Sequence, residues 1–524
     1  MTAERTPPRV NKWLVAMTVM LPTFIEVMDT SVVNVSLPHI QGSLNAGLDE
    51  VTWVLTSYLV SNAIIIPITG WLAGIFGRKR YLIFSLVIFT ISSIVCGAAP
   101  SLEILVLFRI LQGLGGGGLQ PLSQAILLES FPPKEHGIAM AVFGMGVVMA
   151  PILGPVVGGW ITDNWSWRWV FYINLPAGIL AVAMAVFSVH DPAYIRRRTL
   201  QIDKWGLFLL TVGLGCLQVV LDKGEREDWF NSQFIVVLAS ASVIALTLFV
   251  LVELRTAHPV VNLRVFKDRS FAAGNIIMFA GFFCLFGSIV LLPLYLQNLM
   301  SYTALWAGLV LGPGGVASFI VMPIAGVLMK KGVNPRNLLA VGLAISALSL
   351  WLMSGFALDG SFMTFTWPRV VQAVGMGLFF VPLSAATYVG IPREEMGNAS
   401  GIFNLLRNLG GSFGVAFSTT VLAQRSQVHQ SFLVENITPY NKAFQVFYHQ
   451  VRDWFQMHQA HLNVLPDTAA MAVIYREVIR QASMLAFNDT FWLLAVGTAI
   501  LVPLTLVFRR AKGAGGPWKA SIEG

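Results

Sequence analysis

Charged side chains are scarce in this sequence of 524 residues. They make up 11% of the chain, whereas hydrophobic residues make up 56%, and the mean hydropathy is +0.70. A soluble domain usually carries about 25% charged residues. The composition therefore excludes the string of soluble domains that the length alone would suggest.

Cysteine is also rare, and the usual signatures of enzymes are missing. The three cysteines, Cys96, Cys216 and Cys284, all fall inside apolar runs, so the sequence has neither a disulfide framework nor a metal-ligand spacing. The glycines of 115–118 are not followed by the Lys-Ser/Thr of a phosphate-binding loop. No Ser-His-Asp arrangement can be recognised. We therefore expect no enzyme, no metal and no cofactor, and an energy source other than ATP.

The apolar residues gather in runs that are apolar on all sides and long enough, at about 20 residues, to span ~30 Å of hydrocarbon as helices. A transmembrane β-barrel would alternate apolar and polar residues instead. The first run, from Trp13, is long and lacks a small-residue cleavage site, so no cleavable signal peptide is expected. The sequence predicts an all-α polytopic membrane protein with fourteen transmembrane helices. These are expected near 13–37, 51–75, 80–99, 103–128, 138–162, 169–189, 204–221, 233–253, 271–296, 304–329, 336–356, 362–388, 398–424 and 488–508.

Basic residues alternate along this map. They gather in every second segment between the runs, as in 78–80, 196–198 and 330–331, and they account for the net charge of +8, so a nucleic-acid partner is not expected. Cytoplasmic loops of membrane proteins carry the excess of Lys and Arg. The pattern predicts a multi-pass membrane protein with both termini in the cytoplasm.

One loop on the opposite side is long, at 425–487. It is polar and rich in Gln, His and aromatic residues, and Phe444, Phe447, Tyr448 and Val451 have helical spacing. We expect one or two amphipathic helices in it, and a disordered loop is the alternative.

An internal repeat divides the chain. Arg109 and Gln112 recur as Arg369 and Gln372, an offset of 260 residues, and a glycine before a basic loop recurs at a similar offset, at Gly70 and Gly326. Repeats of this kind build transporters, with the substrate path between the two halves. The predicted units are a six-helix bundle in 1–200, two inserted helices in 201–262, and a second six-helix bundle in 263–524 that includes the loop 425–487.

Two acidic residues, Glu26 and Asp29, lie in the first apolar run. A charge at the bilayer centre costs about 2.5–3.5 kcal/mol, and a spacing of three places both carboxylates on one helix face. Low dielectric and a neighbouring like charge both favour the protonated form, which suits a proton carrier. We expect Asp29 to be the main proton site, with Glu26 sharing protons or contacting a cationic drug. The alternatives are a position near the outer headgroups or a static hydrogen-bonded role.

Arg109 is a charge inside the fourth run, and it needs a partner there. An acidic residue of the first helix or backbone carbonyls are the candidates, whereas an arginine at a helix end would extend its guanidinium to the membrane surface. Further polar or aromatic residues within the runs are candidates for the lining of a substrate cavity, although each is more often a packing residue: Asn34, Tyr58, Asn62, Gln112, Tyr295, Gln297, Phe379, Asn404 and Arg407.

Five stretches carry a resemblance that covers nearly the whole chain. They are Glu26-Val-Met-Asp29-Thr-Ser-Val-Val-Asn34, Gly70-Trp-Leu-Ala-Gly-Ile-Phe-Gly77-Arg78, Arg109-Ile-Leu-Gln112-Gly-Leu-Gly115, Ala150-Pro151-Ile-Leu-Gly154-Pro155-Val-Val-Gly158-Gly159, and Trp167-Arg168-Trp169-Val-Phe-Tyr-Ile-Asn174. The chain resembles the major facilitator superfamily, in particular its fourteen-helix drug:proton antiporter branch (DHA2), and is similar to exporters of the EmrB and QacA type.

The resemblance implies a function and a set of conformational residues. These residues are Gly70, Gly77 and Arg78 in the second stretch and Gly154, Pro155, Gly158 and Gly159 in the fourth. The sequence departs from the family at Gly74, where an Asp is usual. Arg109 would act in a proton relay, and a proton gradient would drive export of amphipathic or hydrophobic drugs by alternating access.

The resemblance also implies partners, namely a periplasmic adaptor of the EmrA/HlyD type and an outer-membrane channel of the TolC type, with the loop 425–487 as a docking or gating element. The first alternative is an exporter of one metabolite, such as a siderophore, a fatty acid or a toxin. A membrane-embedded enzyme is the second, and it would need clustered acid-base or metal-binding residues at one membrane face, which the sequence lacks.

Overall fold

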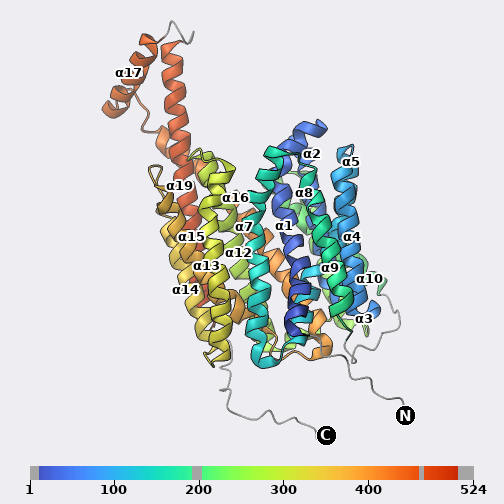
Figure 1. The fold of residues 1–524 in the computed structure, drawn as a ribbon. Helices are drawn as coiled ribbons and strands as arrows, with labels where there is room; N and C mark the ends of the chain where they lie inside the picture. Colours follow the sequence, from blue (N-terminus) through green and yellow to red (C-terminus); the bar gives the residue numbers. More distant parts are fainter. Residues whose placement is uncertain (1–10, 192–202, 459–464, 506–524) are drawn as a thin grey trace, which may run out of the picture.

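The computed structural model describes residues 11–191, 203–458 and 465–505, and every regular element within them is a helix (Figure 1). The first part of the chain forms α1 (Lys12–Leu44), α2 (Leu48–Val51), α3 (Trp53–Phe76), α4 (Arg78–Ala98), α5 (Leu102–Gly116), α6 (Leu119–Ser130), α7 (His136–Asn164), α8 (Trp169–Tyr172), α9 (Asn174–Ser188), α10 (Lys204–Lys223) and α11 (Gln233–Arg255). The second part forms α12 (Arg269–Asn298), α13 (Ala304–Lys330), α14 (Pro335–Met353), α15 (Phe362–Thr387), α16 (Met396–Val434), α17 (Lys442–Met457) and α19 (Pro466–Leu504).

Fourteen of these helical segments are long enough to cross a membrane, as predicted. In the described part of the chain, 13 are also apolar enough, with α2 and α3 forming one span and α5 and α6 another. The remaining segment is α16, which has 39 residues but carries Asn404, Arg407 and Asn408 in its first third. It packs against α12, α19 and α3, within the bundle. The chain is therefore a multi-pass membrane protein with the predicted all-α fold.

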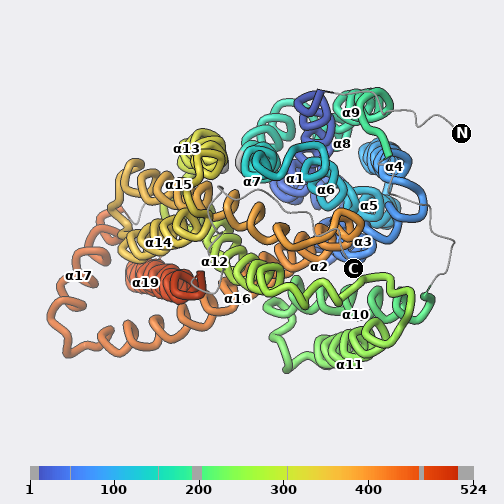
Figure 2. The backbone as a smooth tube through the Cα atoms, turned by 90° about the horizontal axis from the view of Figure 1, so that it is seen from below, coloured from blue at the N-terminus to red at the C-terminus, as the bar shows by residue number. Residues whose placement is uncertain are grey.

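The helices form two bundles with a helical pair beside them (Figure 2). One bundle contains α1 and α3 to α9, and the other contains α12 to α16 and α19. The pair α10 and α11 packs together and contacts α3 and α16. The two bundles meet where α7 contacts α13 and α15 and where α16 contacts α3 and α6.

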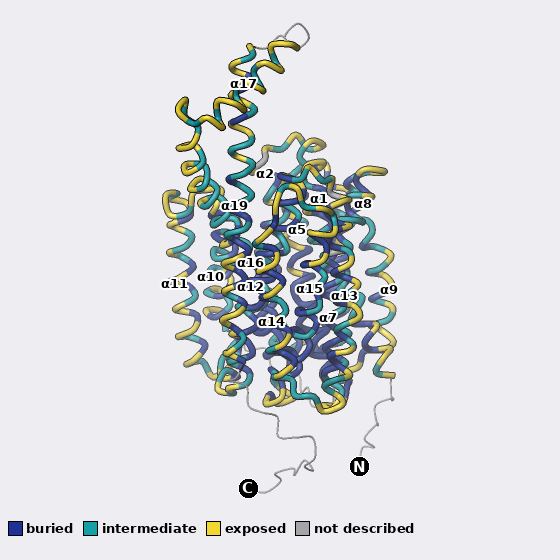
Figure 3. Tube along the Cα trace, turned by 90° about the vertical axis from the view of Figure 1, so that its left-hand side faces the viewer, coloured by how far each residue is buried: buried dark blue, intermediate teal, exposed yellow. Residues whose placement is uncertain are grey.

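The long polar segment 425–487 is more helical than the hydropathy pattern indicates. The predicted end of one helix at 424 and the predicted start of the next at 488 are both wrong, because α16 continues to Val434 and α19 already begins at Pro466. Neither extension contains a Gly or Pro, apart from Pro466 at the first position of α19, so both helices continue beyond the apolar pattern. The predicted amphipathic helix is present as α17, which packs against α19 and has no buried residue (Figures 1 and 3).

The two ends of the described chain lie at the same face of the bundle, opposite α17 (Figure 1). We call this the terminal face. Glu135 forms ion pairs there with Lys12 of α1 and with Lys330 of α13, so it joins the two bundles. Several predicted basic positions lie outside the described residues: Arg5, Arg9, Arg196, Arg197, Arg198, Arg509, Arg510, Lys512 and Lys519.

Candidate functional site

The centre of the first bundle holds a fully enclosed ion pair. Arg109 of α5 donates a hydrogen bond from Nη1 to Oδ2 of Asp29 on α1, with 2.5 Å between the atoms, and both side chains have no exposed surface. Removing two charges from water is costly, and their attraction offsets that cost only if further hydrogen bonds satisfy the remaining atoms. Of the partners expected for Arg109, the structure supplies both the acidic residue of the first helix and a backbone carbonyl, that of Val54 at 3.0 Å.

Two amides hold the Asp29 carboxylate in place. Gln112 donates to Oδ1 of Asp29 at 3.0 Å, and its own oxygen accepts from Arg109 at 2.8 Å. Asn174 of α9 donates to the same Oδ1 at 2.7 Å and to the hydroxyl of Ser93 at 3.0 Å. Five helices, α1, α3, α4, α5 and α9, therefore contribute to this site, and any change in the charge of Asp29 acts on all of them.

Tyr58 of α3 connects this ion pair to the second acidic residue. The Tyr58 ring lies over the Arg109 guanidinium, with 4.1 Å from the ring centroid to Cζ. The Tyr58 hydroxyl donates to Oε1 of Glu26 at 3.3 Å, and Asn62 donates to the same oxygen at 2.9 Å. One side chain thus contacts the partner of Asp29 and binds Glu26.

Glu26 is in turn linked to the second bundle. The amide nitrogen of Gln120 on α6 donates to Oε2 of Glu26, and the amide oxygen of Gln120 accepts from Nη2 of Arg407 on α16. A parallel link joins Asn404 to Gln124, with 2.6 Å between Nδ2 and Oε1. The charge of Glu26 therefore faces a cation of the other bundle across a single glutamine.

The repeat places a similar constellation in the second bundle, with one difference. Arg369 donates from Nη1 to Gln372, as Arg109 donates to Gln112, and Gln372 donates to Oγ of Ser288 at 2.7 Å. Ser288 of α12 follows Asp29 of α1 by 259 residues, so a neutral hydroxyl lies where the first bundle has a carboxylate. Within the described residues, no acidic side chain forms an ion pair with Arg369, and its Nε is buried without a hydrogen-bond partner.

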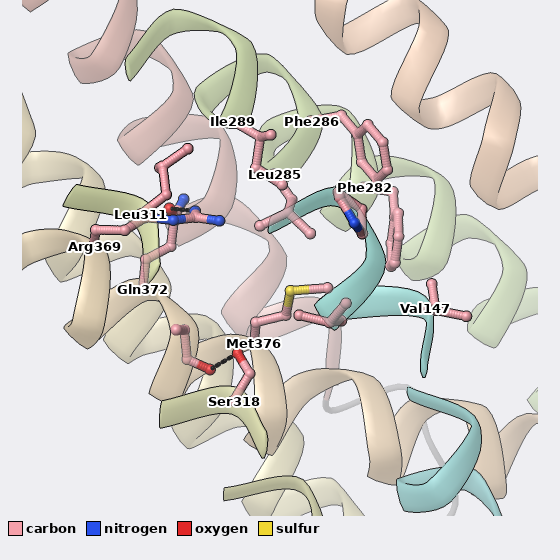
Figure 4. Close-up of a pocket in the computed structure, with 13 residues that line it drawn as sticks. Val147, Phe282, Leu285, Phe286, Ile289, Leu311, Ser318, Arg369, Gln372 and Met376 are labelled. Carbon is pink, nitrogen blue, oxygen red and sulfur yellow. Dashed lines mark hydrogen bonds between the residues drawn. The ribbon is translucent and has the colours of Figure 1, made fainter. Parts of the chain in front are cut away.

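A cavity lies between the bundles next to Arg369 (Figure 4). Arg369 and Gln372 lie on one side, and Phe282, Phe286 and Val147 lie on the other. The full lining is Val147, Val148 and Pro151 of α7, Phe282, Leu285, Phe286 and Ile289 of α12, Leu311 and Ser318 of α13, and Arg369, Gln372, Ala373 and Met376 of α15. A second cavity shares Leu285, Gln372 and Met376 with it and reaches Phe379.

Glycines at the terminal face allow the bundles to touch through their backbones. A Cβ at Gly70 of α3 would overlap the Asn398 backbone of α16 and lie 2.6 Å from the carbonyl carbon of Gly397. Gly77 has a φ of 83°, which favours glycine. Arg78 is nearly buried and forms an ion pair with Glu129 of α6. At Gly74 a Cβ would meet no atom within 4 Å, so this position makes no comparable contact.

The glycines of α7 pack against α1 near the acidic residues. A Cβ at Gly154 would overlap Cβ of Ser31, and one at Gly158 would lie 3.0 Å from the backbone of Val32. Gly159 has room, with 3.9 Å to Val35, and Pro155 lies between the glycines inside the helix. The helix that packs this closely on α1 also forms a wall of the cavity.

The remaining predicted cavity residues lie apart from this cavity. Asn34 and Gln297 are exposed, and Tyr295 packs in an aromatic cluster with Phe356, Phe365 and Phe487. Phe379 belongs to the second cavity, and Asn404 forms its link between the bundles. Sequence reasoning missed Gln120, Asn174, Ser288 and Glu129 as partners. Each is a polar residue in an apolar run, the same signal that singled out Gln112 and Asn62.

Comparisons with known proteins agree with this architecture. The family described as Major Facilitator Superfamily matches residues 19–415. The multidrug export protein EmrB of Haemophilus influenzae is 39% identical over 95% of this chain and 96% of its own length. The multidrug export protein EmrB of Escherichia coli K12 is 36% identical over 98% of this chain and 99% of its own. The crystal structure of the human organic anion transporter MFSD10 aligns with a TM-score of 0.59 at 14% identity, over 94% of this chain and 100% of that one, which shows a shared fold.

Proposed function

Because the chain belongs to the major facilitator superfamily, we propose that it is a proton-coupled antiporter that exports amphipathic or hydrophobic drugs across the bacterial inner membrane. One observation carries the proposal: the buried ion pair of Asp29 and Arg109 is connected through Tyr58 to Glu26, which is linked to Arg407 of the other bundle. Relatives described as multidrug export proteins support the same function.

The contacts suggest how a proton changes the transporter. When Asp29 takes up a proton, Arg109 loses its counter-charge in an enclosed site, and the arrangement of α1, α5 and α9 around it is destabilised. When Glu26 takes up a proton, Arg407 loses the opposite charge across Gln120. That change weakens the attraction between the bundles beside the cavity, so protonation and separation of the bundles favour each other.

The contacts at the terminal face supply the gate. Basic residues gather at this face, and the excess of Lys and Arg in cytoplasmic loops supports a cytoplasmic orientation with both termini inside. Gly70 against Asn398, and Glu135 between Lys12 and Lys330, join the bundles there. In an alternating-access cycle these contacts separate when the cavity opens to the cytoplasm and re-form when it opens outward.

The extended ends of α16 and α19, together with α17, offer a surface for a partner protein. On this orientation, α17 and the ends of α16 and α19 project into the periplasm, where a periplasmic adaptor of the EmrA/HlyD type and an outer-membrane channel of the TolC type would continue the path. Deleting α17 should abolish capture of such an adaptor while the purified protein keeps drug-driven proton release. Intact adaptor capture and efflux after the deletion would remove this part of the proposal.

Proton coupling is tested by drug-driven proton release from purified protein in a weakly buffered solution. The wild type should release protons on adding drug, and Asp29→Asn should not. Asp163→Asn changes an exposed carboxylate of α7 and is the matched control that should behave as the wild type. Retained coupling in Asp29→Asn contradicts the assignment.

The breadth of the substrate range separates the proposal from its alternative. Cells that express the protein should resist a broad panel of amphipathic compounds, and an uncoupler of the proton gradient should remove the resistance. Resistance or export confined to one metabolite, such as a siderophore or a fatty acid, would identify a dedicated exporter instead.

A further inference from the structure

The cavity between the bundles has one cation without a counter-charge. Arg369 is 4% exposed; among the residues that the structure describes, its guanidinium donates to the neutral Gln372, and its Nε is buried without a partner. A buried guanidinium is costly unless a negative charge and further hydrogen bonds compensate it. The guanidinium of Arg369 can therefore bind a further anionic group at the wall of the cavity.

The repeat shows which group is absent. In the first bundle, Gln112 orients Asp29 beside Arg109. In the second, Gln372 donates to Ser288, which has no charge. The two bundles thus share the arginine, the glutamine and their hydrogen bond, and differ in the group that neutralises the arginine.

We propose that this cavity binds an amphiphile with a single anionic headgroup, whose negative charge neutralises Arg369 as Asp29 neutralises Arg109. The inference rests on the proposed export function and names the substrate class of that transporter. An arginine presents several N–H groups in a planar fork that fits a carboxylate or a phosphate oxygen pair. The Nε of Arg369 is such a donor, and it lacks a partner.

The rest of the cavity suits an apolar tail. Apolar side chains contribute most of the wall, among them Phe282, Leu285 and Phe286, as is common in small-molecule sites. A lipophilic cation of the same length would gain the same apolar contacts but would be repelled by Arg369. The headgroup charge therefore decides selectivity here.

A matched pair of ligands tests the charge. Dodecanoate and dodecyltrimethylammonium have tails of the same length and opposite charge, and their binding can be measured by calorimetry on the full chain in phosphatidylcholine nanodiscs, at a pH at which the acid is ionised. The wild type should bind dodecanoate more tightly. Tighter binding of dodecyltrimethylammonium overturns the proposal.

Two variants test the residues. Arg369→Gln should weaken dodecanoate binding by about tenfold or more, since charge-assisted hydrogen bonds are lost. Ser288→Asp should do the same for a different reason, because it supplies an internal carboxylate that occupies the guanidinium. Unchanged dodecanoate affinity in both variants overturns the proposal, and the thermal unfolding midpoint of each shows whether it is folded.

Two further binding measurements distinguish a lipid from a free acid as the ligand, and this inference from the proposed function. In nanodiscs with added phosphatidylglycerol, weaker dodecanoate binding identifies a lipid phosphate that uses the same guanidinium, and unchanged binding identifies a site for free acids. Asp163→Asn, which changes an exposed carboxylate of α7, should bind dodecanoate as the wild type does. Absence of drug-driven proton release from a wild type that binds dodecanoate contradicts the proposed coupling, and absence of dodecanoate binding to a wild type that releases protons contradicts this inference.

Discussion

The ring of Tyr58 covers the guanidinium of Arg109 at 4.1 Å from ring centroid to Cζ. The Tyr58 hydroxyl also binds Glu26, so the residue contacts Arg109 of α5 and Glu26 of α1 through different parts of one side chain. This relationship allows the two contacts to be removed separately.

The first prediction concerns Tyr58. Tyr58→Phe keeps the ring over Arg109 and removes the hydrogen bond to Glu26, so the free energy of unfolding should fall by only about 1 kcal/mol. Tyr58→Leu also removes the cation–π contact, which adds about 2 kcal/mol when desolvated. Thermal unfolding in detergent checks the order, and equal losses in both variants would show that the ring contact contributes nothing.

The second prediction concerns the ion pair. Asp29→Asn alone leaves the buried charge of Arg109 uncompensated, and Arg109→Gln alone leaves that of Asp29. Each variant should lower the free energy of unfolding by about 3–5 kcal/mol. The double variant leaves no charge, so its loss should be smaller than the sum of the two single losses. A double-mutant cycle on unfolding free energies measures this coupling, and additive losses would contradict a direct pair.

The third prediction compares two glycines in the same segment. Gly70→Ala places a Cβ against the Asn398 backbone and should keep α3 and α16 from closing on each other at the terminal face. The closed arrangement should be destabilised by about 1–3 kcal/mol. Gly74→Ala meets no atom within 4 Å and should be tolerated. Export rates in everted vesicles measure the difference between the two variants. Equal rates would show that the contact of Gly70 with Asn398 has no part in transport.

The fourth prediction compares two glycines of α7. Gly154→Ala overlaps Ser31 and should push α7 away from α1, with a loss of export and of thermal stability. Gly159→Ala meets only Val35 at 3.9 Å and serves as the control. Normal export by Gly154→Ala would show that the packing of α7 on α1 is not required in the cycle.

Much of the fold could be predicted from the sequence because lipid imposes a simple pattern. Uniformly apolar runs, basic segments in alternation and the repeat at Arg109 and Arg369 were enough to predict fourteen helices. The extensions of α16 and α19 could not be predicted in this way, since hydropathy identifies the part of a helix that lies in hydrocarbon and does not mark where the helix itself ends.

The site could be predicted only in part. An acidic partner on the first helix followed from the cost of an unpaired Arg109, and the structure shows Asp29 in contact with it. The link from Glu26 through Gln120 to Arg407 depends on side chains 94 and 287 residues apart in the chain, and no periodicity specifies such a contact. The same holds for Asn174, whose role follows only from the packing of α9 on α1.

The length of α19 has a mechanical consequence. Its 39 residues form one helix from the core of the second bundle out to α17, about 58 Å at ~1.5 Å per residue. A rod of this length acts as a lever: each degree of tilt at its inner end displaces the outer tip by about 1 Å. In the proposed alternating-access cycle, a tilt of a few degrees would therefore move α17 by several ångströms.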